Sequence, residues 1–179
     1  AVLQYLYETQ KNDLSHLTKI TPYTTGQFMM IDTSTRRNLE LVETLREKQK
    51  RGSLLWVLDK TKTAMGARLL RSFIEQPLID KTEIERRQQA IEELNMNYIS
   101  REEIREYLNS VYDLERLMGR ISYKTANPRD LLSFKNSLEM LPYIKDILGE
   151  FSCELLKKMN EDLDPLRDLY ELIDRSIVD

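Results

Sequence analysis

The sequence predicts an all-α fold, a bundle of about eight or nine helices with at most one short strand. Only five glycines and five prolines occur among 179 residues, which leaves little material for hairpin turns. Apolar residues recur at spacings of three and four, the period of a helix with one buried face. Hydrophobic residues make up 41% of the chain and charged residues 32%, so we expect a folded core under a charged surface.

The N-terminal part of the chain is the least regular. Residues 1–11 carry apolar side chains at helical spacing and predict a short linking helix. Residues 12–31 are polar and predict a loop, within which residues 28–31 are the only strand candidate of the chain. We therefore divide the chain into a linking helix, 1–11, and a main domain, 12–179.

Two helices are expected after this loop. Asp32 or Thr33 is placed to cap the first, which we expect to extend to Gly52. Ser53 is placed to cap the second, whose residues 54–58 are all apolar. Such a continuous run is typical of core, so Trp56 is predicted to be buried.

The later helix starts share one pattern, a side-chain acceptor immediately before an apolar repeat. They are Thr63, Asp80 with Glu83, Ser100 with Glu103, Asp113, Asn127 before Pro128, and Asp164 before Pro165. Pro77 is expected to stop the helix that begins at Thr63, because a residue before proline avoids the α conformation. The apolar residues 131–141 and 144–148 are predicted as two separate helices, the second ending at Gly149.

The sequence assigns no catalytic, cofactor-binding or metal-binding residue. His16 is the only histidine and lies in the polar loop, where we expect it to be solvated. Cys153 is the only cysteine, which excludes an intrachain disulfide and fits a reducing cytoplasm. The glycines are too far apart to form a phosphate-binding loop. The acidic pairs Glu92–Glu93 and Glu102–Glu103 are expected to lie on solvated helix faces.

The net charge of −3 gives the chain no overall basic field that would attract nucleic acid. Three arginine groups could contact phosphates, but acidic neighbours favour pairing within the helices. These groups are Arg36–Arg37 with Glu40, Arg86–Arg87 with Glu83 and Glu85, and Arg68 and Arg71 with Glu75. No apolar run approaches the roughly 20 residues that span a bilayer, and we expect no signal peptide, because the chain opens without a basic start or an apolar run. We expect a cytoplasmic piece of a longer protein.

Three blocks of the sequence resemble the core domain, domain III, of the MutS family of DNA mismatch-recognition proteins. They are residues 30–41 (MIDTSTRRNLEL), residues 52–66 (GSLLWVLDKTKTAMG) continuing to Pro77-Leu78, and residues 112–131 with YDLERL, GRI and ANPRDL. Their order and spacing agree with the family, and the resemblance covers essentially the whole chain.

The resemblance implies a non-catalytic helical lever that links DNA-binding regions to an ATPase. It implies a dimeric parent that binds mismatched DNA, with ATP and Mg held in an ATPase domain outside this chain. The connector, clamp and ATPase domains would be the packing partners of residues 12–179, which resemble a core domain truncated before the clamp insertion. Phe73-Ile74-Glu75 imitates the Phe-x-Glu signature of the mismatch reader, but the helical spacing turns Phe73 and Ile74 toward the core.

Two other functions remain open from the sequence. A MutS paralogue acting in recombination would share the lever. A helical protein–protein scaffold unrelated to repair would share only the fold class. The sequence on either side of this segment would separate them, because a downstream phosphate-binding loop indicates any MutS protein and an upstream Phe-x-Glu reader indicates mismatch repair.

Overall fold

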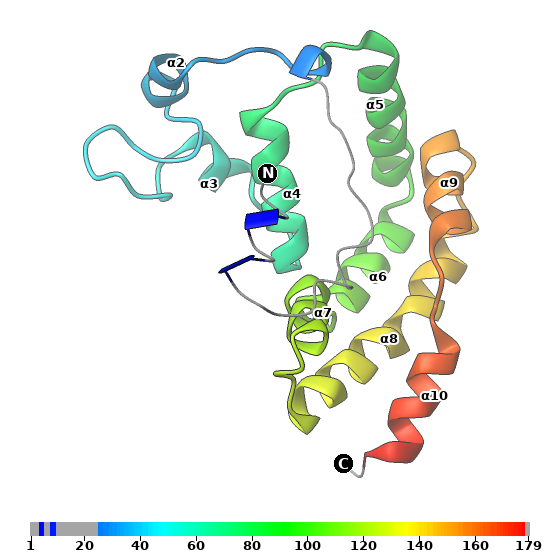
Figure 1. Ribbon diagram of the computed structural model, residues 1–179. Helices are drawn as coiled ribbons and strands as arrows, with labels where there is room; N and C mark the ends of the chain where they lie inside the picture. Colours follow the sequence, from blue (N-terminus) through cyan, green and yellow to red (C-terminus); the bar gives the residue numbers. More distant parts are fainter. Residues whose placement is uncertain (1–3, 6–7, 10–24, 178–179) are drawn as a thin grey trace.

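The structure, a computed structural model, describes residues 4–5, 8–9 and 25–177 (Figure 1). The elements of the described part are the 3-10 turn η1 (Thr25–Gln27) and the helices α2 (Thr33–Asn38), α3 (Leu54–Leu58), α4 (Ala64–Glu75), α5 (Lys81–Met96), α6 (Tyr98–Asn109), α7 (Leu114–Ser122), α8 (Pro128–Leu148), α9 (Glu154–Asp162) and α10 (Arg167–Ser176). The prediction of an all-α fold is confirmed. None of the described helices is both long and apolar enough to cross a membrane.

The extended piece expected near residues 28–31 is a single bridge and not a strand. Phe28 and Leu78 form an isolated antiparallel bridge, and the Met29 N–H donates to the Pro77 carbonyl at 2.8 Å. This bridge ties the segment before α2 to the segment after α4. Residues 4–5 and 8–9 are helical, and the rest of the predicted linking helix lies outside the described residues.

Six predicted caps are confirmed by the same hydrogen bond, in which a side-chain oxygen accepts the backbone N–H three residues later. The capping residues are Asp32, Ser53, Thr63, Asp80, Asp113 and Asn127. At Asn127 the bond is reciprocal, because the Asp130 carboxylate also accepts the Asn127 N–H at 3.0 Å.

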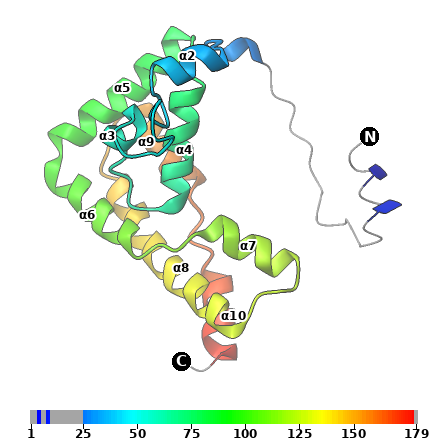
Figure 2. The ribbon, with the colours of Figure 1, turned by 90° about the vertical axis from the view of Figure 1, so that its left-hand side faces the viewer.

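Helix α8 holds the bundle together because it contributes to two separate hydrophobic clusters. Leu117, Phe134 and Leu138 form the first cluster, where α7 and α10 pack on the N-terminal part of α8. Ala90, Ile147, Phe151 and Leu156 form the second, where α9 packs on its C-terminal part and α5 packs on α9. In Figure 2, α8 runs obliquely through the molecule from α10 toward α9. One helix therefore joins two cores.

The prediction of two helices over residues 131–149 is wrong, since α8 continues through Pro142. Proline has no N–H, so the Leu138 carbonyl loses its usual helical donor. The ring of Pro142 is exposed, while Leu141 packs against the first cluster and Ile144 is buried. Packing on both sides of the proline keeps the helix continuous. Its end at Gly149 is as predicted.

The first predicted helix is much shorter than expected, because α2 ends at Asn38 and not at Gly52. Glu40 has a left-handed backbone with φ of +48°, which interrupts the helix. Its carboxylate accepts the Leu45 N–H at 2.7 Å, and its carbonyl accepts the Leu54 N–H at 3.0 Å. The backbone of Glu40 thus supports the start of α3.

Two helix starts are displaced from their predicted positions. Helix α6 begins at Tyr98 because Asn97 ends α5 and starts α6 directly, and the Ser100 hydroxyl donates to Glu150 at 3.0 Å. Helix α10 begins after Leu166, whose left-handed backbone follows a turn closed by the Asp164 carboxylate. Helix α9 was not predicted at all.

Candidate functional site

Helices α3 and α4 form a unit that is separate from the bundle of α5 to α10. In the described part of the chain, α4 packs closely on α3, whereas α5 to α10 pack on one another. Figure 1 shows α2 and α3 on the side of α4 away from α5 and α9. The side chains that connect α4 to the bundle are therefore the candidates for transmitting a displacement between the two parts.

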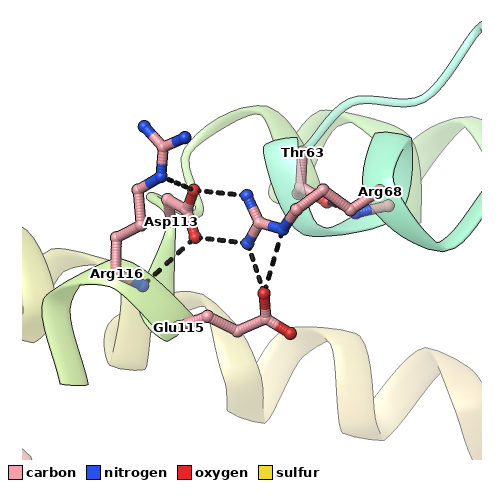
Figure 3. A network of polar contacts seen from close by, with 6 residues as sticks. Thr63, Arg68, Asp113, Glu115 and Arg116 are labelled. Atoms are coloured by element: carbon pink, nitrogen blue, oxygen red, sulfur yellow. Dashed lines mark hydrogen bonds and ion pairs between the residues drawn. The ribbon is translucent and has the colours of Figure 1, made fainter. Parts of the chain in front are cut away.

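The strongest of these connections is made by Arg68 of α4 (Figure 3). Its two terminal nitrogens donate to the two carboxylate oxygens of Asp113, both at 2.7 Å, at the start of α7. Its Nε also donates to Glu115 at 3.0 Å, and a terminal nitrogen contacts the same oxygen. A planar guanidinium matched to a carboxylate in this way fixes orientation as well as distance.

We call the contacts of Arg68 with Asp113 and Glu115 the joint between α4 and α7. Asp113 makes contacts with both helices of this joint. Its carboxylate accepts the Arg116 N–H at 3.3 Å, which caps α7, and it also receives the Arg116 side chain at 3.4 Å. The hydrogen bonds from Arg68, together with the Arg116 N–H and the nearby positive charges, lower the pKa of Asp113 to about 2. The carboxylate therefore stays ionised at neutral pH, committed to this joint and not to proton transfer.

The start of α4 places Arg68 for this role. The Thr63 hydroxyl oxygen accepts the Gly66 N–H at 3.0 Å. A Cβ at Gly66 would lie 3.1 Å from that oxygen, so a larger residue would push the cap away. The tight first turn fixes the direction in which Arg68 leaves the helix toward α7.

A second connection joins α4 to α5. The Arg87 guanidinium lies 4.0 Å from the centre of the Phe73 ring, a cation–π contact. Phe73 was expected to face the core, yet it remains 39% exposed under this arginine. Glu75, the other half of the Phe-x-Glu imitation, pairs with Arg71 at 3.2 Å.

The arginine predictions are therefore only partly right. Pairing within a helix is confirmed for Arg71 with Glu75 and for Arg86 with Glu83, at 3.6 Å. It is wrong for Arg68 and Arg87, which reach other helices. It is also wrong for Arg36, whose Nε donates to the Ile31 carbonyl at 3.1 Å.

The prediction that Glu93 lies on a solvated helix face is wrong, because its carboxylate accepts hydrogen bonds from another segment of the chain. It accepts the N–H and the hydroxyl of Ser152, both at 2.6 Å, and the Cys153 N–H at 2.8 Å. These bonds lower the pKa of Glu93 to about 2. A carboxylate of α5 thus caps the N-terminus of α9, where the helix dipole favours negative charge. Glu102 lies on a solvated helix face as predicted, with its side chain 41% exposed, and it pairs with Arg101 and Arg105.

The opposite end of α9 is held by a cation from α8. The Lys145 ammonium donates to the carbonyls of Asn160 and Leu163, both at 2.6 Å. Lys135, also on α8, is buried and pairs with Asp174 of α10 at 3.2 Å. Long-range polar contacts thus fix α9 and α10 on α8 in addition to the two cores.

The prediction that Trp56 is buried is wrong. Trp56 is 48% exposed, and in the run 54–58 only Leu55 is buried. A helix of five residues turns only one side to its neighbours, so one of its apolar side chains reaches the interior. His16, which was predicted to be a solvated loop residue, lies outside the described residues.

Comparison with known proteins gives one consistent result. The family model of MutS domain III matches residues 34–179. A protein named DNA mismatch repair protein MutS from Lachnoclostridium phytofermentans is 69% identical over 179 residues, 100% of this chain and 19% of that protein. Proteins of the same name from Caldanaerobacter subterraneus and Clostridium tetani are 54% and 49% identical, over 100% and 99% of the chain.

These relatives are much longer than the chain, which covers 19% to 21% of their lengths. The match nevertheless includes the whole described bundle and the joint around Arg68 and Asp113. The unrelated scaffold considered from the sequence is excluded by this match. The chain belongs to the MutS domain III family.

Proposed function

We propose that this chain is the coupling module, or lever, of a MutS protein, transmitting changes between DNA-binding regions and an ATPase in the same polypeptide. The observation that carries the proposal is the architecture of α8, which joins two separate hydrophobic cores. A helix held at both ends by packing and polar contacts moves as one body, so a displacement of one core is passed to the other.

The joint at Arg68 supports the same role. It connects the α3–α4 unit to α7 through bonds that depend on orientation, and α7 packs on α8. A movement of α4 would therefore reach α8 through Asp113.

In this proposal the parent is a cytoplasmic homodimer that binds mismatched duplex DNA. Residues 12–179 form its core domain and residues 1–11 a link to the preceding domain. ATP and Mg bind in the ATPase domain outside the chain, so this module itself holds no cofactor and catalyses no reaction. The connector, clamp and ATPase domains are its packing partners.

The test uses the full-length protein that contains this chain. Arg68→Ala should reduce the stimulation of ATP hydrolysis by mismatched DNA, while basal hydrolysis and binding to the mismatch remain. Arg71→Ala is the matched control, because Arg71 pairs only within α4 in the contacts described above. Equal stimulation in both variants would contradict the role of this joint.

A MutS paralogue acting in recombination is the second candidate. The names of the three relatives favour mismatch repair. Competition between matched and G·T-mismatched duplexes for the full-length protein distinguishes the two. We expect a preference for the mismatch, and equal affinities would favour the recombination paralogue.

A further inference from the structure

Helix α10 lies on α8 along a stripe of apolar side chains that repeats at every helical turn. Leu166, Tyr170 and Ile173 pack against the first cluster. Their spacing of four and three residues returns an apolar side chain to the same face once per turn. A shift of α10 by one turn would place Tyr170 where Ile173 lies and Leu166 where Tyr170 lies, and only the place of Leu166 would lose its side chain. Apolar packing alone therefore does not fix where α10 lies along α8.

A buried charge on α8 fixes that place. Among the described residues, Lys135 is the only charged one that is buried, with 6% of its surface exposed. Its ammonium pairs with Asp174 of α10 at 3.2 Å. A buried charge is costly unless it is paired, so burial favours a carboxylate beside Lys135 wherever α10 lies. Buried polar groups of this kind can set the place of one helix along another.

A second carboxylate lies one turn earlier on α10. Glu171 precedes Asp174 by three residues, so a one-turn shift brings Glu171 close to the place of Asp174. In this structure Glu171 is exposed and pairs with Arg167 of the same helix at 3.0 Å. An exposed pair within one helix contributes little to stability, so it would not prevent Glu171 from pairing with Lys135.

The segment that leads into α10 has the spare length for such a shift. The Lys145 ammonium holds the Leu163 carbonyl at the end of α9. Beyond this point the chain folds into a turn, in which the Asp164 carboxylate accepts the Leu166 N–H at 2.9 Å. Leu166 has a left-handed backbone with φ of +51°, which is unfavourable for a residue other than glycine. Opening the turn would relieve this conformation and lengthen the segment, because an extended residue spans about 3.4 Å.

We infer that α10 has two positions on α8 and that Lys135 selects between them through its acidic partner. In the Asp174 position, which is the one described here, the turn at residues 164–166 is closed and all three apolar side chains reach the first cluster. In the Glu171 position the turn is open and α10 lies about 4.5 Å further toward its own C-terminus, three residues at the helical rise. Side chains interdigitate in a packed core, so a placement between the two would separate the stripe from the cluster. The two positions are therefore discrete.

The direction of the shift follows from the arrangement of the two helices. Figures 1 and 2 both show α10 running opposite to α8, beside the N-terminal part of α8. A shift of α10 toward its own C-terminus therefore moves it away from the C-terminal end of α8. This inference depends on the contacts between α8 and α10 and is independent of the proposed coupling.

Zero-length cross-linking of the full-length protein identifies the carboxylate that contacts Lys135. A water-soluble carbodiimide joins an ammonium to a carboxylate beside it, and mass spectrometry identifies both residues. The unsubstituted protein should give mainly the Lys135–Asp174 amide. Asp174→Asn removes that carboxylate and keeps its shape, so the yield of the Lys135–Glu171 amide should rise several-fold. The matched control is Asp168→Asn, which removes an exposed acid of the same helix and should leave the Lys135–Asp174 amide unchanged. No rise of the Lys135–Glu171 amide would overturn the inference.

A bent Lys135 side chain could also reach Glu171, so a second measurement follows the helix itself. Nitroxide amino acids replace Asp146 of α8 and Arg175 of α10, which are both exposed. Pulsed electron paramagnetic resonance should show their separation lengthening by about 4 Å in Asp174→Asn.

A label pair at Asp146 and Lys158 of α9 is the control, and its separation should stay the same. An unchanged separation between Asp146 and Arg175, a broader distribution without a displaced maximum, or an equal change in the control pair would overturn the inference. Neither measurement uses ATP hydrolysis or DNA, so its failure is distinguishable from a failure of the proposed coupling.

Discussion

A double-mutant cycle on Arg68 and Asp113 measures the joint between α4 and α7 directly. The variants are Arg68→Ala, Asp113→Asn and their combination. Asparagine is as good a helix cap as aspartate, so Asp113→Asn removes the charge and keeps the cap of α7. The coupling energy between the two changes is then the part of the Arg68–Asp113 interaction that depends on the charge of the carboxylate.

The structure sets the expected size of this coupling energy. Two charge-assisted hydrogen bonds at 2.7 Å would contribute about 1.5–3 kcal/mol if they were shielded from water. The Arg68 side chain is 42% exposed, however, so solvent screening lowers the expected value to about 1 kcal/mol. The pKa of Asp113 is lowered from 3.8 to about 2. The contribution of the ionised Asp113 to the free energy of unfolding is therefore complete above a pH of 3.8 and is lost as the pH falls through about 2.

Urea unfolding of the 179-residue chain, followed by far-UV circular dichroism, gives the four free energies of unfolding. The matched control is the same cycle on Arg71 and Glu75, an exposed pair within one helix that should give about 0.3–0.5 kcal/mol. The Arg68 coupling should also decrease in high salt. A coupling energy no larger than the control, or one that is indifferent to salt, would refute the reasoning.

Four further predictions follow from the packing and the caps. Leu138→Ala should cost about 3 kcal/mol in urea unfolding, because this side chain is 2% exposed among three helices. A cost under about 1 kcal/mol would mean that the cavity collapses. Asn127→Ala should cost about 1 kcal/mol, and no change would show that α8 starts elsewhere. Trp56 in the isolated chain should be quenched readily by iodide, and weak quenching would contradict its exposure. Glu93→Gln should lower the protection factors of amide exchange in α9, and the protection factors of the unsubstituted chain should also fall as the pH falls through about 2. Unchanged exchange rates would exclude the capping role.

The helix caps could be predicted because they depend on neighbouring residues. Asp80 and Asn127 bind backbone N–H groups three residues away, so the sequence contains both partners side by side. For the same reason the end of α4 before Pro77 was predictable. All of these features depend on residues within about one helical turn of one another.

The joint and the start of α9 could not be predicted because their partners are distant in the sequence. Arg68 has Glu75 within its own helix, yet it pairs with Asp113 and Glu115 of another helix. Cys153 begins α9 without a capping side chain of its own, and Glu93 of α5 takes that role. Which partner is chosen depends on the tertiary packing.

The burial of Trp56 was mispredicted for a different reason. A run of apolar residues shows that a surface avoids water, but it does not show which molecule or domain covers it. The described residues contain a core that covers Leu55 and none that covers its neighbour Trp56. In a piece of a longer protein, hydrophobic sequence therefore predicts contact more reliably than it predicts burial.

The length of α8 has a geometric consequence. Its 21 residues extend for about 30 Å at the usual helical rise. If the helix pivoted about the second cluster, at Ile147, a tilt of about 10° would move its N-terminal end by about 5 Å, close to the pitch of an α-helix. A shift of one pitch is the distance at which side chains of a packed helix exchange one set of neighbours for the next. A rotation too small to disturb the packing at the pivot is thus large enough to change the register of contacts at the other end.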